Sequence, residues 1–212
     1  MTGSTAAPMN GRKAQAARND QLILDAARAV FIADPTAPIS AVAERANVGI
    51  SALYRRYPSK EELLRRLCAD GLRRYITAAE AMLADEGDPW DAFVRFMRTL
   101  VDAGSNSLTQ RLADTFTPTD DLYHDAATAQ ERNERVFARV REAGVVRPDL
   151  DVNDIGLILE QLASIRLGNE GRTHELRHRY LALYLEAMRR PADMALPGPA
   201  PTWSELGERW NA

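Results

Sequence analysis

The sequence feature that most constrains this chain is a set of helix breakers that divides residues 18–66 into short helical segments. Apolar residues recur at helical spacing over 18–32, 39–46 and 50–57, and prolines or an Asn-Val-Gly turn separate these segments. Asn and Gly readily adopt the positive φ angles that such a tight turn often needs. The pattern therefore predicts three short helices, of which the second and third are joined by a turn of about three residues.

A long helix is predicted to follow the third segment. In Ser59-Lys60-Glu61-Glu62 the Ser59 hydroxyl can accept a hydrogen bond from the N–H three residues on, while Glu62 can reach back to the Ser59 amide. This capping box predicts a helix that reaches into the low 80s. Further helices are predicted over 89–103, 108–116, 120–143, 153–167 and 173–190. Because no segment shows convincing strand alternation, the fold class is predicted to be all-α.

The three short helices have the outline of a helix-turn-helix. In this motif the second helix of the pair lies in the DNA major groove, with its N-terminal side chains at base edges. Small residues permit close approach, Ser can bond several base edges, and Arg can bind guanine with two hydrogen bonds. We therefore expect base contacts from Ile50, Ser51, Ala52 and Arg55, phosphate contacts from Tyr54, Tyr57 and Lys60, and a basic arm that carries Arg12, Lys13 and Arg18.

The distribution of charge agrees with this interpretation. The chain has a formal net charge of -3, yet residues 1–66 hold ten Lys and Arg against six Asp and Glu. That segment is therefore +4, and the remainder is -7. A basic N-terminal third beside an acidic remainder indicates that the N-terminal part binds a polyanion and that the rest of the chain has a different function.

The stretch "ISAVAERANVGISALYRRYPSKEELLRR" resembles the DNA-binding region of TetR-type (tetracycline-repressor-like) transcriptional regulators, and the similarity extends back through "ILDAARAVF". Asn47 and Ser51 stand where the family often has glycine, and Ala52 stands where it often has threonine. Beyond residue 70, the order of helices and "AGVVRPDLDVNDIGLILEQL" are similar to family members. The resemblance implies a homodimer that binds a palindromic double-stranded DNA operator, represses transcription, and is released by a small-molecule effector bound in its C-terminal body.

The predicted domain organisation follows from these segments. We expect a basic flexible arm over residues 1–17, a helix-turn-helix domain over 18–66, a helical regulatory and dimerisation domain over 67–191, and a Pro-rich tail over 192–212. The tail carries Trp203, Leu206 and Trp210, which can dock on a helical body of the same or the partner protomer.

The helix predicted over 153–167 is apolar on more than one face, so it needs two packing partners. We expect it to pair with the helix over 173–190 in a homodimer interface, the alternative being burial inside a monomer. Candidate residues for the effector pocket mix aromatic and polar groups, as ligand cavities do. They are Phe93, Phe96, Met97, Leu112, Phe116, Tyr123, Phe137 and Gln161.

A competing interpretation comes from His174, Glu175 and His178, which match the H-E-x-x-H motif of zinc-dependent hydrolases. A catalytic zinc site needs a third protein ligand; downstream acids such as Glu186 exist, but the other histidine, His124, lies far upstream. The buried stripe of this helix is predicted to consist of Leu176, Tyr180, Leu183 and Ala187. Each His would lie about 200° from a stripe member and face solvent. We therefore expect no metal site and no enzymatic activity.

Other properties exclude further classes of protein. The start "MTGSTAAPMN" has no basic segment followed by an apolar run, and apolar residues nowhere continue for the ~20 positions that a membrane span needs. We expect a cytoplasmic protein with no membrane partner and no cofactor. Cys68 is the single cysteine of the sequence, which excludes an internal disulfide and a multi-cysteine metal site.

Overall fold

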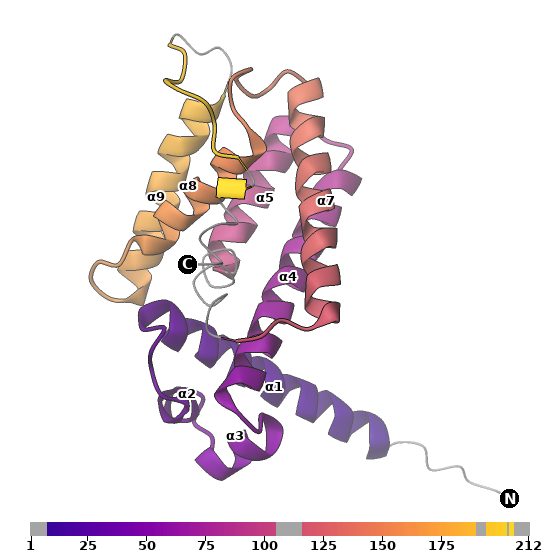
Figure 1. The fold of residues 1–212 in the computed structure, drawn as a ribbon, viewed down its shortest axis with the longest axis vertical. Coiled ribbons are helices and arrows are strands. Elements are labelled where there is room, and N and C mark those ends of the chain that lie inside the picture. The colour runs from indigo at the N-terminus through magenta and orange to yellow at the C-terminus, as the bar shows by residue number, and fades with distance from the viewer. Residues whose placement is uncertain (1–7, 105–115, 190–193, 203, 206–212) are drawn as a thin grey trace, which may run out of the picture. The chain divides into compact units, whose positions relative to one another are not determined.

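A computed structural model describes residues 8–104, 116–189, 194–202 and 204–205 (Figure 1). The chain divides into two compact units between Leu67 and Cys68, and the predicted division lies between residues 66 and 67. The helix predicted over 108–116 falls, apart from its last residue, outside the described residues, as do the three apolar tail residues Trp203, Leu206 and Trp210.

The N-terminal unit, up to Leu67, contains α1 (Pro8–Ala33), α2 (Ile39–Arg45), α3 (Ile50–Arg56) and the first residues of α4 (Lys60–Ala84). The three later helices begin within one residue of their predicted starts. However, α1 begins ten residues before its predicted start, so part of the predicted flexible arm is helical. Residues 9–17 are rich in Ala, Gln, Arg and Lys, which favour helix, and Pro8 suits the first helical position.

The turn between α2 and α3 has the predicted chemistry. Asn47 adopts a φ of 53°, the left-handed conformation that Asn tolerates better than most residues. The amide of Val48 then donates to the carbonyl of Ala43 at 2.9 Å, which closes the turn. Val42 of α2 and Leu53 of α3 are both fully buried in the core of the unit. The turn therefore fixes the direction in which α3 leaves α2.

The predicted cap of α4 is partly present. The Ser59 hydroxyl accepts from the Glu62 amide at 3.1 Å. The Glu62 carboxylate, however, pairs with Arg65 at 3.2 Å. Ser59 alone still satisfies one of the free N–H groups of the first turn.

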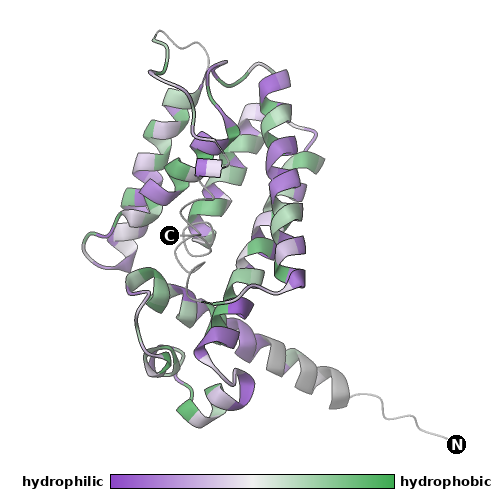
Figure 2. Cartoon of the chain, viewed as in Figure 1, coloured by the Kyte–Doolittle hydropathy of each residue, from purple (hydrophilic) through white to green (hydrophobic). Residues whose placement is uncertain are grey.

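The C-terminal unit, from Cys68 onward, contains the rest of α4 together with α5 (Pro89–Ala103), α7 (Asp120–Glu142), α8 (Val152–Ser164) and α9 (Glu170–Met188). Hydrophilic and hydrophobic residues alternate around α7 in Figure 2, so this helix buries one face and exposes the other. The largest fully buried side chains of the unit are Phe93, Met97, Leu162, Leu181 and Met188. Apart from one isolated antiparallel bridge between Val146 and Arg189, the regular structure of the described residues is helical, which confirms the all-α prediction.

The inward face of α9 differs from the predicted stripe. Leu181, Leu185 and Met188 are buried against the core, whereas Tyr180 and Leu183 are 46% and 60% exposed. Two apolar faces run along this helix, and helical spacing alone does not distinguish the one that meets the core. The prediction that Tyr180, Leu183 and Ala187 form the buried stripe was therefore wrong, although Leu176 is buried.

The described part of the tail is attached to its own chain. Arg147 Nη2 donates to the Met194 carbonyl at 2.5 Å, and the Leu196 amide donates to Asp149 Oδ2 at 2.8 Å. Arg147 and Asp149 also pair with each other at 2.6 Å, which holds the pKa of the Asp149 carboxyl well below its usual range. Among the described helices, none combines the length and the apolar character that crossing a bilayer requires.

Candidate functional site

One side of α3 is exposed while its other side anchors the helix. Ile50 is 40% exposed, Tyr54 is 46% exposed, and Ser51, Ala52 and Arg55 are also classed as exposed. On the opposite side, Leu53 is fully buried and holds α3 against the N-terminal unit. Five of the predicted DNA-contact residues are therefore exposed on a helix whose opposite side is buried.

The C-terminal end of α3 is tied to α1 through Asp20. Arg56 Nε donates to Asp20 Oδ1 at 2.5 Å, Arg56 Nη2 donates to Asp20 Oδ2, and the Tyr57 hydroxyl donates to Asp20 Oδ1 at 3.1 Å. The Arg56 guanidinium lowers the pKa of the Asp20 carboxyl, and burial together with the Asp20 charge raises the pKa of Tyr57 to about 12. Sequence reasoning missed Asp20, because no motif links residues 36 positions apart.

Tyr57 and Lys60 differ from the other predicted contact residues because their polar groups are bonded within the protein. Tyr57 is only 3% exposed, and its hydroxyl is already bonded to Asp20. The Lys60 ammonium donates to three carbonyls of the loop after α1, the shortest bond being 2.8 Å to Ala37, and it lies 5.2 Å from the centre of the Phe31 ring. The remaining two carbonyls are those of Pro35 and Thr36, at 3.5 and 3.3 Å. The predicted phosphate contacts of Tyr57 and Lys60 stay predictions, and the contacts that the structure shows are internal.

The three residues of the predicted basic arm all lie on α1. Arg18 is exposed, and its Nη2 donates to Gln15 Oε1 at 2.7 Å, one turn earlier. Arg12 and Lys13 belong to the same helix as Arg18, and contact of these three residues with DNA stays a prediction.

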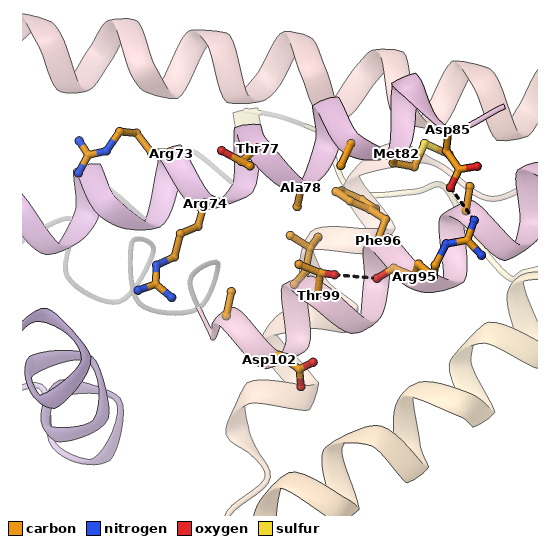
Figure 3. Close-up of a pocket in the computed structure, with 14 residues that line it drawn as sticks. Arg73, Arg74, Thr77, Ala78, Met82, Asp85, Arg95, Phe96, Thr99 and Asp102 are labelled. Atoms are coloured by element: carbon orange, nitrogen blue, oxygen red, sulfur yellow. Dashed lines mark hydrogen bonds and ion pairs between the residues drawn. The ribbon is translucent and has the colours of Figure 1, made fainter. Parts of the chain in front are cut away.

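The C-terminal unit has a pocket of about 680 Å³ between α4 and α5 (Figure 3). Phe96, Ala78 and Met82 form an apolar part of its lining. Arg73 and Arg74 line it from α4, and Asp102 lines it from the last turn of α5. Arg95 lies near the opposite end of the view, paired with Asp85 at 2.6 Å. An apolar wall with a few charged groups is typical of a site for a small organic molecule.

The eight residues predicted to line an effector pocket are distributed over several environments. Phe96 lines the pocket between α4 and α5, whereas Phe93, Met97 and Phe137 are buried in the core. Tyr123 is 62% exposed, Gln161 is exposed, and Phe116 is partly buried. Leu112 lies outside the described residues. The structure thus brings one of these eight residues to this pocket, and helical spacing gave no signal for Thr77, Thr99 or the arginines that line it.

The side chain of His174 is 63% exposed and that of His178 is 26% exposed, and the two histidines share one partner. Their rings lie side by side on α9, with centroids 4.5 Å apart, and both Nε2 atoms contact Asp102 Oδ1 on α5. The expectation that both histidines face solvent was therefore wrong for His178, and the contact of both with Asp102 was not predicted. It relied on the incorrect stripe of α9, and Asp102 lies too far away in sequence for spacing to reveal it.

The comparisons with known proteins agree with this geometry. The model described as "Bacterial regulatory proteins, tetR family" matches residues 23–67, which contain the α2–α3 pair. The model described as "Transcriptional regulator SbtR-like, C-terminal domain" matches residues 88–190. A search of curated proteins found no significant match.

Solved structures of TetR regulators have the same fold. A TetR regulatory protein from Mycobacterium vanbaalenii is 28% identical, with a TM-score of 0.54, and the match covers 84% of this chain and 98% of that one. A TetR regulator from Streptomyces coelicolor is 24% identical, with a TM-score of 0.57 and coverage of 82% and 99%. The TetR-like regulator LfrR from Mycobacterium smegmatis, solved with proflavine, is 23% identical, with a TM-score of 0.56 and coverage of 79% and 96%.

Regulators of this family are generally DNA-binding proteins without enzymatic activity, and they form dimers. The N-terminal match falls on the helix-turn-helix, and the C-terminal match spans α5 to α9. The chain belongs to the TetR family of bacterial transcriptional regulators.

Proposed function

We propose that this protein is a ligand-responsive repressor that binds a palindromic operator as a homodimer and leaves it when a small-molecule effector binds. The observation that carries the proposal is the exposed face of α3. Ser51, Tyr54 and Arg55 project from a helix whose opposite side is buried through Leu53. In a helix-turn-helix, this is the face that enters the major groove.

The contacts on this face divide into two classes. Arg55 carries a guanidinium that can bond guanine O6 and N7 together, and Ser51 at the N-terminal end of α3 can bond several base edges. Ile50 and Ala52 permit close approach and supply apolar contact. Tyr54 is suited to a phosphate oxygen, which positions the helix without reading sequence. We propose that Tyr57 and Lys60 act mainly by holding α3 and the loop after α1 in place.

The dimer interface is proposed to consist of α8 and α9, within the ranges 153–167 and 173–190. Tyr180 and Leu183 form an exposed apolar face on α9, opposite the face that packs on the core. Leu157 and Ile158 of α8 are only partly buried. Apolar side chains of this size gain stability when a second protomer covers them. A two-fold dimer presents two α3 helices to two half-sites, and successive major grooves lie about 34 Å apart.

Release from DNA is proposed to follow from a shift in population. An effector that binds more tightly to a conformation with a different spacing of the α3 helices favours that conformation, and the dimer then no longer matches two successive grooves. The pocket between α4 and α5 is the proposed effector site. Its volume of about 680 Å³ lies within the range of small-molecule sites. The helix α4 begins shortly after α3 and also lines the proposed effector site, so effector binding can act on the helix-turn-helix through α4.

The test is selection of bound sequences from a random pool of double-stranded DNA. The wild-type protein should enrich one inverted repeat, and the double variant Tyr54→Ala with Arg55→Ala should lose that enrichment. The double variant Arg98→Ala with Tyr123→Ala is a matched control, because it removes the same two residue types from exposed positions of the C-terminal unit. It should enrich the same repeat as the wild type.

The absence of any enriched sequence, at low and at moderate salt, would contradict the proposal. Enrichment of a single half-site without its inverted copy would contradict the dimer while leaving sequence reading by α3 in place. An enriched repeat that survives loss of both Tyr54 and Arg55 would assign recognition to a different surface.

A further inference from the structure

Three potential metal ligands from two helices meet at one point of the C-terminal unit. Asp102 Oδ1 lies 3.0 Å from His174 Nε2 and 2.6 Å from His178 Nε2. One ligand atom from each residue lies within 4.8 Å of the other two. Asp102 belongs to the last turn of α5, and the histidines lie one turn apart on α9.

The packing of α9 explains why these side chains converge. Residues 174, 178, 181, 185 and 188 are spaced alternately by four and three positions, so they share one face of the helix. Leu181, Leu185 and Met188 are buried against the core, which fixes the rotation of α9 about its axis. This rotation points His174 and His178 toward α5, and the side chain of His178 is only 26% exposed. The fold therefore brings the three side chains together at the surface, where His174 and Asp102 are 63% and 52% exposed.

We propose that Asp102, His174 and His178 form a binding site for a divalent transition-metal ion such as Zn²⁺. Two imidazole nitrogens and one carboxylate oxygen suit zinc and its first-row neighbours, whereas Mg²⁺ and Ca²⁺ prefer sites made of oxygen ligands alone. Ligand bonds of about 2.0–2.2 Å place ligand atoms roughly 3–3.5 Å apart around an ion. The two distances from Asp102 Oδ1 to the histidine nitrogens need to lengthen by less than about 1 Å to reach that spacing, which side-chain rotation can supply.

The position of the site gives a bound ion a structural consequence. Asp102 also lines the pocket between α4 and α5, so it is shared by the pocket and the metal site. An ion held by Asp102 and the two histidines would join the C-terminal end of α5 to α9 beside that pocket. The protein groups supply three ligands, which leaves at least one coordination position for water or another small ligand.

The sequence around the histidines does not give this site the arrangement of a zinc hydrolase. In the H-E-x-x-H motif the Glu acts on a metal-bound water. Here the Glu175 carboxylate pairs with Arg172 at 2.9 Å, and its side chain is 66% exposed. The proposal is therefore a binding site, and it is independent of whether α3 reads DNA.

The test is a competition titration of Zn²⁺ between a chromogenic chelator and the full chain, purified without a polyhistidine tag. Wild-type protein should bind one equivalent. Asp102→Asn, which keeps the size of the side chain, should weaken binding at least tenfold, and His178→Ala should weaken it further. His124→Ala is the matched control, because this exposed histidine of α7 lies outside the cluster, and its affinity should equal that of wild type.

A second readout reports the ligands directly. Co²⁺ in the wild-type site should give a visible absorption spectrum that is altered in Asp102→Asn, while circular dichroism confirms that each variant remains helical. Lack of saturable Zn²⁺ binding by the wild type would overturn the proposal. So would equal affinities of wild type and Asp102→Asn, because binding would then involve the two histidines without the carboxylate. Each of these results is separate from the outcome of the DNA selection.

Discussion

Lys60 gives the sharpest distinction between the sequence-based and the structural account of one residue. Its ammonium donates to the carbonyls of Pro35, Thr36 and Ala37, and it lies 5.2 Å from the centre of the Phe31 ring. Lys60→Met keeps most of the side-chain stem but removes the charge and all three donors. We expect this change to destabilise the loop between α1 and α2 rather than to act mainly on DNA.

The magnitude follows from the burial of the partners. Thr36 is exposed, so water can replace the ammonium at its carbonyl, whereas Ala37 is 7% exposed and its carbonyl accepts the shortest bond, at 2.8 Å. Loss of a charge-assisted bond to such a group costs about 1.5–3 kcal/mol. The contact with the fully buried Phe31 ring adds about 0.5–1 kcal/mol. Because the two terms are not additive, we expect about 2 kcal/mol.

Hydrogen exchange measured by mass spectrometry reports this change locally. Peptides that cover residues 34–46 should exchange roughly 30-fold faster in Lys60→Met, because every 1.4 kcal/mol corresponds to a factor of ten in the opening equilibrium. Arg55→Met is the matched control, since it removes one positive charge from an exposed position of α3. Its exchange over 34–46 should equal that of wild type.

One result would contradict an internal role of the Lys60 ammonium. If exchange over 34–46 were unchanged while DNA affinity fell and the salt slope decreased by about one unit, the ammonium would be a phosphate contact, as the sequence predicted. Faster exchange with an unchanged salt slope would support the internal role.

Three further substitutions test the contacts of Asp20, the turn at Asn47 and the exposed face of α9. Asp20→Asn should lower the free energy of unfolding by only about 1 kcal/mol at pH 7, because Arg56 is half exposed and Asn can still accept from Tyr57. Since the pKa of Asp20 is lowered in the folded state, the difference from wild type should be constant above about pH 5 and should shrink as the pH falls below about 4. Urea unfolding at pH 3–7 measures this difference, and a pH-independent difference would contradict the prediction. Asn47→Val should lower the free energy of unfolding by roughly 1–2 kcal/mol in the same assay, because a β-branched residue is strained at a φ of 53°. Asn47→Gly should stay within about 0.5 kcal/mol of wild type, because Gly adopts this conformation without strain. Equal stabilities of the two variants would contradict the role of the turn. Leu183→Glu places a charge on the exposed face of α9, so it should convert the dimer to a monomer while helicity stays unchanged. Size-exclusion chromatography with light scattering measures the change. A dimer that persists would exclude that face as the interface.

The fold was predictable from sequence where a local signal determines it. Breakers at Pro35, Pro38 and Pro58 and the cap at Ser59 mark helix ends by their own chemistry, so the bounds of α2, α3 and α4 agree with prediction within one or two residues. The start of α1 was missed because residues 8–17 carry no apolar stripe, although their helix propensity is high.

The candidate sites were predictable only in part, because they depend on contacts between distant residues. The exposed face of α3 follows from helical spacing around Leu53. The bonds of Asp20 to Arg56 and Tyr57, and the approach of Asp102 to His174 and His178, join residues 36 to 76 positions apart. On α9, two apolar faces gave equally regular spacing, and the choice of the wrong one turned the histidines away from α5.

We expect the exposed face of α3 to read the same base in both halves of an inverted repeat. The most direct measurement is the complete base-preference profile of Arg55→Ala, compared with that of wild type, across every position of the selected operator. We expect the preference for one base to fall by about 1–3 kcal/mol at one position and at its symmetry mate, with the other positions unchanged. A uniform loss of affinity across all positions would make Arg55 a phosphate contact and contradict the claim, as would an unchanged profile.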